Sequence, residues 1–167
     1  SILLHYDEHK STQGRKLARE ENDRDASKLD KAIHKFQPEY VFHLAAQPLV
    51  KKSYNDPVHT FDTNIMGSVN LLDSVRRCSS IHSLVFITSD KCYENMEWIW
   101  GYRETDKLGG YDPYSASKGA AEIIFSSYLR SYFESRQSIG AASARAGNVI
   151  GGGDWALDRI IPDCIRS

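Results

Sequence analysis

Short continuous apolar runs alternate along the chain with longer stretches in which apolar residues recur three and four positions apart. The runs lie at residues 40–44, 81–88 and 138–146, and residues 1–4 could be the end of a further strand. Such runs are typical of strands that are buried on both faces of a sheet. Strands that alternate with helices predict a parallel sheet covered on both faces, a doubly wound, Rossmann-like α/β fold.

Residues that favour helix starts mark the stretches between these runs. Asp25 can cap a helix that runs to about residue 36. Pro57 and Pro113 suit the first turns of two longer helices, which we expect to end near residues 77 and 135. Residues 157–166 predict a short final helix.

An unusual cluster follows each predicted strand. Residues 45–47 are Ala-Ala-Gln, residues 89–91 are Ser-Asp-Lys, and residues 147–148 are Gly-Asn. In doubly wound sheets, ligands bind beyond the carboxyl ends of the strands. The coincidence of all three clusters with strand ends is the strongest sequence evidence for a binding site.

Composition narrows the class of protein. The 167 residues predict one domain, and the net charge of -1 provides no general attraction to nucleic acid or to an anionic membrane. Three cysteines without a Cys-x-x-Cys pair argue against a disulfide scaffold and favour a reducing cytoplasm. No apolar run approaches the ~20 residues of a membrane span, and no cluster of His, Cys and carboxylates has the spacing of metal ligands.

Tyr114 and Lys118 are four residues apart in a predicted helix, so their side chains should lie on the same face. An ammonium favours a nearby phenolate, so we expect Lys118 to lower the pKa of Tyr114 and make it a base near neutral pH. The same spacing is also common between ordinary neighbours on an amphipathic helix.

Ser89, Asp90 and Lys91 directly follow a predicted buried strand and can face one cleft. A carboxyl group beside an amine can serve as acid and base if burial raises the pKa of Asp90 and lowers that of Lys91. An exposed Asp–Lys turn is the simpler alternative.

Two loops and one histidine complete the candidates. Residues 147–154 are rich in glycine, which lets the backbone approach a ligand, and Asn148 could bond phosphate or sugar oxygens; a plain turn is an equal alternative. Residues 92–112 form a long aromatic loop that could stack on a base or pack on the core. His43 lies within an apolar run and is expected to be a core residue.

Taken together, residues 20–167 resemble the extended short-chain dehydrogenase/reductase family and, within it, the group of CDP-glucose 4,6-dehydratases. The most diagnostic stretches are residues 88–94, 98–104, 109–114 and 145–155. Tyr114 and Lys118 are similar to the family's Tyr-x-x-x-Lys pair. Lys91 resembles the residue found at this position in CDP-glucose 4,6-dehydratases, whereas the related dehydratases that act on dTDP-glucose have Glu there.

The resemblance implies that CDP-glucose becomes a 4-keto-6-deoxy sugar through an internal redox cycle, a step in the synthesis of deoxysugar polysaccharide precursors. Tyr114 would take the proton of the 4-hydroxyl while hydride passes from C4 to NAD, and Lys118 would hold the nicotinamide ribose. Lys91 would remove the C5 proton, and Asp90 would protonate the departing 6-hydroxyl. Ser89 would hydrogen-bond the 4-oxygen.

The resemblance also implies roles for residues without acid–base chemistry. Asn148 would contact the nucleotide diphosphate, and Asn64 lies where the family keeps an Asn behind the catalytic Lys. Residues expected to line the cofactor, besides the catalytic Tyr and Lys, are Asn22, Asp23, Leu44, Ala45, Ala46 and Thr63.

The sequence also departs from the family. It shows no glycine-rich turn of the kind that binds the NAD pyrophosphate at a helix N-terminus, and Asn22 stands where the family has an adenine-facing Asp. We therefore expect residues 1–150 to form an NAD-binding domain that is incomplete at its N-terminal side. Residues 151–167 would begin the sugar-nucleotide region. We expect this segment alone to bind NAD weakly.

Two other functions stay open at this point. One is a dehydratase or epimerase that acts on another nucleotide sugar, and the other is a non-catalytic scaffold. The intact Tyr114 and Lys118 favour an enzyme, whereas the missing glycine-rich turn favours a scaffold. The family associates through the helices at residues 58–77 and 113–135, which implies a homo-oligomer.

Overall fold

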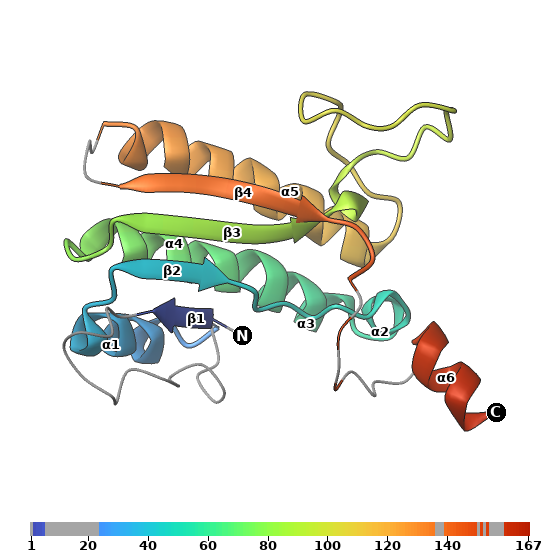
Figure 1. Ribbon diagram of the computed structural model, residues 1–167, viewed down its shortest axis with the longest axis horizontal. Helices are drawn as coiled ribbons and strands as arrows, with labels where there is room; N and C mark the ends of the chain where they lie inside the picture. Colours follow the sequence, from blue (N-terminus) through green and yellow to red (C-terminus); the bar gives the residue numbers. More distant parts are fainter. Residues whose placement is uncertain (1, 6–23, 136–138, 150, 152, 154–158) are drawn as a thin grey trace.

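A computed structural model describes residues 2–5, 24–135, 139–149, 151, 153 and 159–167 (Figure 1). The strands are β1 (Ile2–His5), β2 (Tyr40–His43), β3 (Ser83–Ser89) and β4 (Gly140–Ala146). The α-helices are α1 (Ala26–Phe36), α2 (Val50–Asn55), α3 (Pro57–Phe61), α4 (Gly67–Arg77), α5 (Pro113–Tyr128) and α6 (Ile160–Arg166). Three short helical turns are η1 (Asp62–Met66), η2 (Asp90–Cys92) and η3 (Leu129–Phe133).

The strands form one sheet in the order β1-β2-β3-β4. Strands β2, β3 and β4 are parallel, which confirms the Rossmann-like α/β fold. Strand β1 pairs antiparallel with β2, a direction that the apolar pattern did not predict. An apolar run can predict that a strand forms, but the direction of that strand in the sheet depends on the path of the chain between strands.

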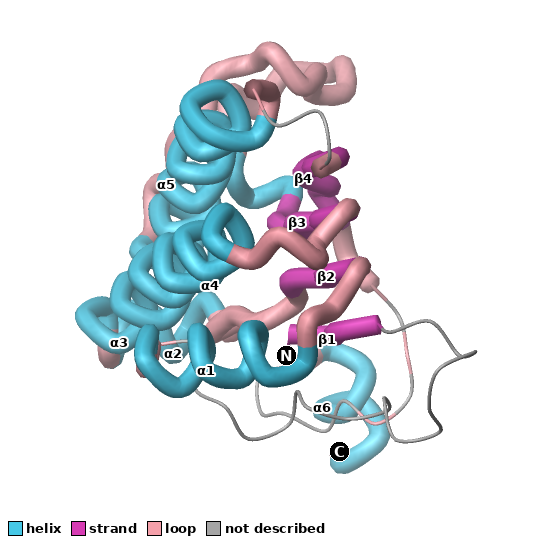
Figure 2. Tube along the Cα trace, turned by 90° about the vertical axis from the view of Figure 1, so that its left-hand side faces the viewer, coloured by secondary structure: helices cyan, strands magenta, loops and turns pink. Residues whose placement is uncertain are grey.

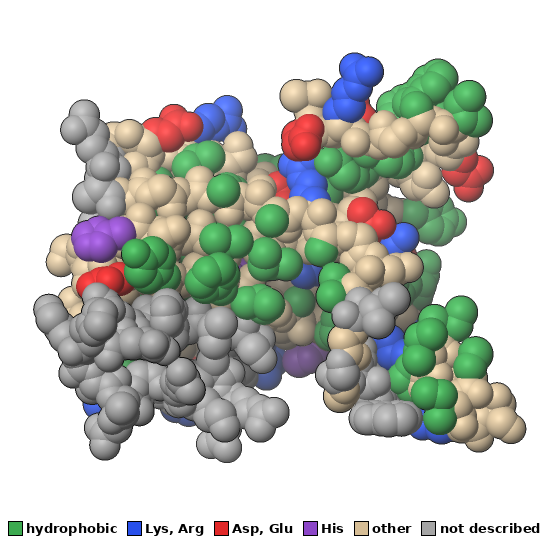
Figure 3. Space-filling view, viewed as in Figure 1, with side chains coloured by type: hydrophobic (Ala, Val, Ile, Leu, Met, Phe, Trp, Pro, Cys, Tyr) green, Lys and Arg blue, Asp and Glu red, His purple; other side chains and the backbone are tan. Residues whose placement is uncertain are grey.

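The helix layer explains the burial pattern of the strands. Figure 2 shows α1, α4 and α5 together on one face of the sheet. Burial alternates along β3, where Leu84 and Phe86 are buried against the helices and Val85 and Ile87 are only half-buried. Figure 3 views the opposite face, across which hydrophobic side chains gather. In the part of the chain that the structure describes, α1, α4 and α5 cover one face of the sheet.

The core lies between the sheet and the helix layer. Ile33 of α1, Leu71, Leu72 and Val75 of α4, and Leu84 of β3 are at most 1% exposed. They recur at three- and four-residue spacing on the helices because that spacing puts them on one face. Each such side chain stabilises the fold by roughly 1.5–3 kcal/mol relative to an exposed one.

The predicted helix starts are confirmed by their caps. Asp25 accepts a hydrogen bond from the backbone N–H of Lys28, and Asp112 accepts one from that of Ser115, both at 3.0 Å. Asp56 caps α3 in the same way, ahead of Pro57 in the first turn. A cap of this kind contributes about 1 kcal/mol to helix stability.

Both long predicted helices are interrupted. The helix expected at residues 58–77 contains the π turn η1, and the helix expected at residues 113–135 ends in the π turn η3. Helix α2 is not predicted from the sequence, because six residues are too few to show a helical period. Single π turns in α-helices are frequent at functional sites, and η1 contains Asn64.

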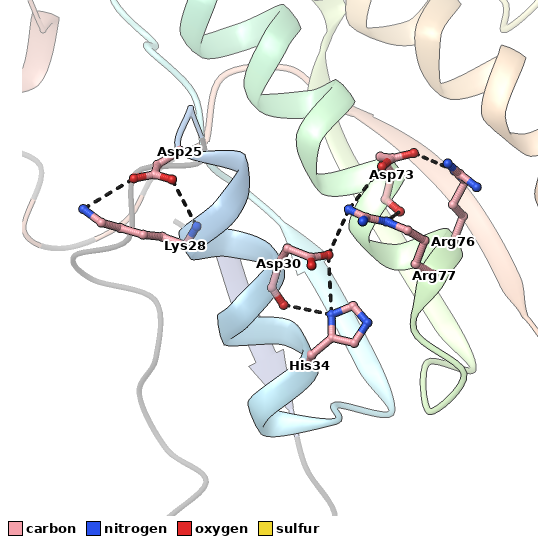
Figure 4. Close-up of polar contacts among 7 residues, drawn as sticks. All are labelled: Asp25, Lys28, Asp30, His34, Asp73, Arg76 and Arg77. Carbon is pink, nitrogen blue, oxygen red and sulfur yellow. Dashed lines mark hydrogen bonds and ion pairs between the residues drawn. The ribbon is translucent and has the colours of Figure 1, made fainter.

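Charged side chains join α1 to α4 on the molecular surface (Figure 4). Arg77 lies 2.9 Å from Asp30 and 3.2 Å from Asp73, and Arg76 lies 2.6 Å from Asp73. These groups are partly exposed, so each pair contributes only about 0–1 kcal/mol. They orient the two helices, whereas the apolar core supplies most of the stability.

Candidate active site

Two strand ends meet at the centre of the candidate site. Ser89 is in register with Ala146, so the residues that follow β3 and β4 lie next to each other. A Cβ atom built on Gly147 would lie 4.0 Å from Oδ2 of Asp90. Asn148 is exposed just beyond this point. The predicted convergence of these clusters is present in the structure.

The turn η2 presents the Ser-Asp-Lys triplet. Ser89 Oγ donates a hydrogen bond to Oδ1 of Asp90 at 3.0 Å and accepts one from the backbone N–H of Lys91 at 3.3 Å. The side chains of Asp90 and Lys91 are exposed. The burial that the acid–base argument required is therefore not provided by the described residues.

Helix α5 holds Tyr114 and Lys118 on its buried face. Their exposed fractions are 9% and 7%, and Nζ of Lys118 lies 5.8 Å from the centroid of the Tyr114 ring. The predicted stacking of the two side chains is confirmed. The backbone N–H of Tyr114 donates to Oγ of Ser53 at 3.2 Å, which ties the start of α5 to α2.

The expected effect of Lys118 on Tyr114 is not found. Burial raises the pKa of Tyr114, a hydrogen bond with Ser89 lowers it, and the negative charge of Asp90 raises it again. Burial also lowers the pKa of Lys118, to about 8. Four-residue spacing alone does not determine the pKa of Tyr114, because burial disfavours the charged form of both groups.

Ser89 connects the two halves of the site. Its hydroxyl lies close enough to the phenol of Tyr114 to lower the pKa of that group, and it donates a hydrogen bond to the carboxylate of Asp90. Asp90 is close enough for its charge to act on Tyr114. A phenol on α5 and a carboxylate on η2 therefore face the same space at the carboxyl end of β3.

Asn64 fixes the loop after β2 against α5. Its Oδ1 accepts from the backbone N–H of Gln47 at 2.8 Å, and its Nδ2 donates to the Gln47 carbonyl at 3.2 Å and to Oγ of Ser117 at 2.8 Å. Ser117 directly precedes Lys118. The π turn η1 places this Asn between two elements that both belong to the candidate site.

The residues expected to line a cofactor lie mainly at the end of β2. Leu44 is 51% exposed, and Ala45 and Ala46 are half-buried, so small side chains leave this backbone approachable. Oγ1 of Thr63 is buried and has no hydrogen-bond partner among the described residues. Asn22 and Asp23 lie outside the described residues.

His43 is a core residue, as expected. It is 2% exposed, its ring lies 4.8 Å from that of Phe86, and burial lowers its pKa to about 3. A neutral imidazole packed between the sheet and the helices has no access to a ligand.

The aromatic loop packs on the protein at its base and is exposed at its tip. Tyr93 stacks on Tyr102 at 5.0 Å, and Tyr102 lies 5.3 Å from Trp98. Ile99 and Trp100 are 96% and 64% exposed. Of the two open alternatives, packing is therefore confirmed for the base of the loop.

A buried ion pair lies behind the loop. Glu122 of α5 is 3% exposed, and its Oε2 accepts from Nη2 of Arg145 at 2.9 Å and from Ser143 at 3.1 Å. Its Oε1 accepts from Thr88. This pair connects α5, β3 and β4, and no sequence pattern predicted it because its members are far apart along the chain.

A cleft of about 540 Å³ opens beside this pair. Its lining residues are Asp90, Tyr93, Tyr102, Glu104, Ser143, Ala144 and Arg145. The cleft thus joins the aromatic loop to the edge of β4 and reaches the carboxylate of Asp90.

The sequence of this chain is similar to known proteins that act on nucleotide sugars. The sequence matches the GDP-mannose 4,6 dehydratase family over residues 4–146. The chain belongs to this family. The expected membership of a nucleotide-sugar dehydratase group is therefore confirmed.

Individual relatives of this dehydratase family sharpen the match. The chain is 56% identical over 148 residues to the CDP-glucose 4,6-dehydratase of Salmonella typhimurium, which covers 86% of the chain and 41% of the relative. The resemblance to that group is confirmed. The chain spans less than half the length of this relative.

Solved structures show the same fold. The UDP-glucose 4-epimerase of Thermus thermophilus, in complex with NAD, matches with a TM-score of 0.72 and 31% identity over 91% of this chain and 47% of that one. A dTDP-glucose 4,6-dehydratase of Streptomyces venezuelae matches with a TM-score of 0.76 at 21% identity, over 87% and 42% of the two chains. The second likeness shows the fold alone.

The described ranges of this dehydratase-family chain contain neither a membrane-spanning helix nor a cluster of metal ligands. No helix there is both long and apolar enough to cross a membrane. No group of three or more His, Cys, Asp or Glu side chains in these ranges could hold a metal ion.

Proposed function

We propose that the chain carries the catalytic centre of an NAD-dependent CDP-glucose 4,6-dehydratase. The observation that supports this best is the contact of α5, which carries Tyr114, with the turn η2, where Ser89 donates a hydrogen bond to Asp90. The 56% identity to the Salmonella enzyme favours CDP-glucose over other nucleotide sugars. Lys91 follows Asp90 in the turn η2, and by resemblance this residue distinguishes the CDP-glucose dehydratases from those that act on dTDP-glucose.

The chemistry of the site fits NAD. The small side chains of Ala45 and Ala46 leave the end of β2 open to a flat ring, and Lys118 would donate to the hydroxyls of the nicotinamide ribose. NAD held there would supply the acceptor for the C4 hydride and the donor for its return to C6, and its positive ring would favour the phenolate of Tyr114. Thr63 and Leu44 would border the same ligand.

Tyr114 and Ser89 would act on the 4-hydroxyl of the sugar. Ser89 would hydrogen-bond the 4-oxygen, and Tyr114 would take its proton as the C4 hydride leaves. The resulting 4-ketone makes the C5 hydrogen acidic. Because Tyr114 is buried, water is excluded, and the proton would pass directly from the 4-hydroxyl of the sugar to Tyr114.

Asp90 and Lys91 would carry out the elimination. Lys91 in its neutral form would take the C5 proton, and Asp90 would give a proton to the 6-hydroxyl, which leaves as water. Hydride return to C6 and proton return to C5 would then give the 4-keto-6-deoxy sugar. Both side chains are exposed, so we propose that the bound hexose covers them. Asn148 would contact the diphosphate.

An end-product assay tests this function. The complete natural chain that contains this sequence is incubated with NAD and CDP-glucose, and with dTDP-glucose and UDP-glucose in parallel. We expect the alkaline absorbance of a 4-keto sugar to appear with CDP-glucose. If another nucleotide sugar is turned over in place of CDP-glucose, the protein is a dehydratase or epimerase for that sugar. If none is turned over, a non-catalytic scaffold is favoured.

We also propose that the helix layer associates with a second copy. Val58, Met66 and Ile123 are 77%, 47% and 59% exposed on α3, η1 and α5, an apolar surface on the outer side of these helices. Light scattering should give a dimer, and Ile123→Glu should give a monomer.

Two further assignments belong to this proposal. Residues 151–167 would begin the sugar-nucleotide region, where α6 exposes Ile160, Ile161 and Ile165. Cys78, Cys92 and Cys164 are unpaired, which favours a reducing compartment such as the cytoplasm.

A further inference from the structure

One side chain holds the base of the aromatic loop from outside the loop. Arg145 of β4 donates through Nη1 to the phenol oxygen of Tyr93 at 2.7 Å and to the carbonyl of Glu104 at 3.0 Å. Its guanidinium carbon lies 4.9 Å from the centroid of the Tyr93 ring. The two contacted residues lie on the outgoing and returning arms of the loop, so one guanidinium links both arms.

Arg145 is itself held in a fixed orientation. Its side chain is 17% exposed, and Nη2 donates to Glu122, whose side chain is 3% exposed. Glu122 also accepts from Thr88 and Ser143. A planar guanidinium with a fixed donor fork is suited to bridging three acceptors, whereas an ammonium on a flexible stem is not.

The loop base is continuous with the turn that carries Asp90. Tyr93 directly follows η2, and its N–H donates to the carbonyl of Asp90 at 3.3 Å. On the return arm, the N–H of Gly109 donates to the carbonyl of Cys92 at 2.9 Å. A Cβ on Gly119 of α5 would lie 3.0 Å from the Gly109 carbonyl, so the loop is in close contact with the helix of Tyr114. Moving Tyr93 would therefore move Asp90 and Lys91.

We propose that Arg145 is a positioning residue that acts through Tyr93 to hold the Asp90–Lys91 turn in the geometry for elimination. This rests on the dehydratase function proposed above. Tyr114 and Lys118 are fixed by α5 and by the Asn64 contacts instead. Loss of Arg145 should therefore slow removal of water from the sugar and spare the oxidation at C4.

The test compares Arg145→Lys, Tyr93→Phe and the double variant Glu122→Gln/Arg145→Met in the complete natural chain. The double variant leaves no unpaired buried charge. Arg76→Lys is the matched control, because Arg76 lies over Tyr132 at 5.1 Å in a similar contact on the outer helix surface. Single turnovers with CDP-glucose and NAD are followed by the absorbance of reduced nicotinamide and by product formation.

In Arg145→Lys, product formation should slow by roughly 100-fold, as expected for a misplaced catalytic group, while reduced nicotinamide appears at the parent rate and accumulates. Tyr93→Phe should show the same imbalance more weakly, and Arg76→Lys should match the parent. Equal slowing of both phases, or parental kinetics in Arg145→Lys and the double variant, would contradict the proposal.

Hydrogen exchange gives a readout that does not depend on the substrate. In the parent, the amides of Glu94, Met96 and Gly109 are bonded within the loop. They should lose protection in Arg145→Lys while the amides of β3 keep theirs. Unchanged loop protection would also contradict the proposal. If the parent does not turn over CDP-glucose, the proposed function fails and this measurement still decides whether Arg145 holds the loop.

Discussion

The two halves of the candidate site are built in different ways. Tyr114 and Lys118 are buried on a long helix, whereas Asp90 and Lys91 are exposed on a three-residue turn. Hydrogen bonds from two other elements fix the first pair, but the second pair depends on the aromatic loop that follows it. The comparison indicates that the proposed oxidation half is formed by the fold itself and that the proposed elimination half is formed by a loop.

The largest expected effect is at Tyr114. Tyr114→Phe removes the phenol proposed as the base for the 4-hydroxyl, and general acid–base catalysis contributes about 10²–10⁴-fold. We expect turnover of CDP-glucose to fall by roughly 10⁴-fold, with neither reduced nicotinamide nor product formed. Tyr132→Phe, an exposed tyrosine at the end of the same helical stretch, is the matched control and should match the parent. Retention of more than a tenth of the turnover would exclude Tyr114 as the base.

Asp90 should give the next largest effect. Asp90→Asn keeps the hydrogen bond from Ser89 but cannot protonate a leaving hydroxyl, so steady-state product formation should fall by about 10³-fold. Asp106→Asn, within the same loop and away from the turn, is the control. Normal product formation by Asp90→Asn would assign the acid role to another group.

Lys118 should link function to stability. Its pKa is lowered from 10.5 to about 8, so the folded chain binds this proton less tightly than the unfolded chain. Stability is then reduced in full below pH 8 and rises as pH increases from 8 toward 10.5. Lys118→Met should raise the free energy of unfolding by up to about 3 kcal/mol at neutral pH while abolishing turnover. The difference in urea unfolding should shrink at alkaline pH, and Lys91→Met, at an exposed site, should show no such gain.

Asn64 should show the smallest of these effects. Asn64→Ala leaves the backbone N–H of Gln47 and the hydroxyl of Ser117 without their buried partner, which costs about 2 kcal/mol. Urea unfolding measures the loss, and Asn70→Ala on the adjoining helix, where the side chain is partly exposed, should lose only a few tenths of that. Equal losses would show that the Asn64 contacts do not hold the oxidation half in place.

Local sequence signals predicted the fold well. Apolar runs predicted the three parallel strands, and Asp25, Pro57 and Pro113 marked helix starts because each acts within the first turn of its helix. The π turns and the direction of β1 were missed, since no local pattern encodes them.

The site was predicted as a set of residues but not as an environment. The clusters after β2, β3 and β4 were visible because each follows its own strand. The burial of Tyr114 and the Glu122–Arg145 pair depend on contacts between distant elements. Residue spacing therefore predicted the wrong direction for the pKa of Tyr114 and did not predict the ion pair.

A single-turnover experiment on Asp90→Asn beside Tyr114→Phe tests the division of the site most directly. With CDP-glucose and NAD, the account predicts that Asp90→Asn forms reduced nicotinamide at nearly the parent rate and retains it, while Tyr114→Phe forms none. Failure of Asp90→Asn to form any reduced nicotinamide would contradict it, because the two halves would then not act separately.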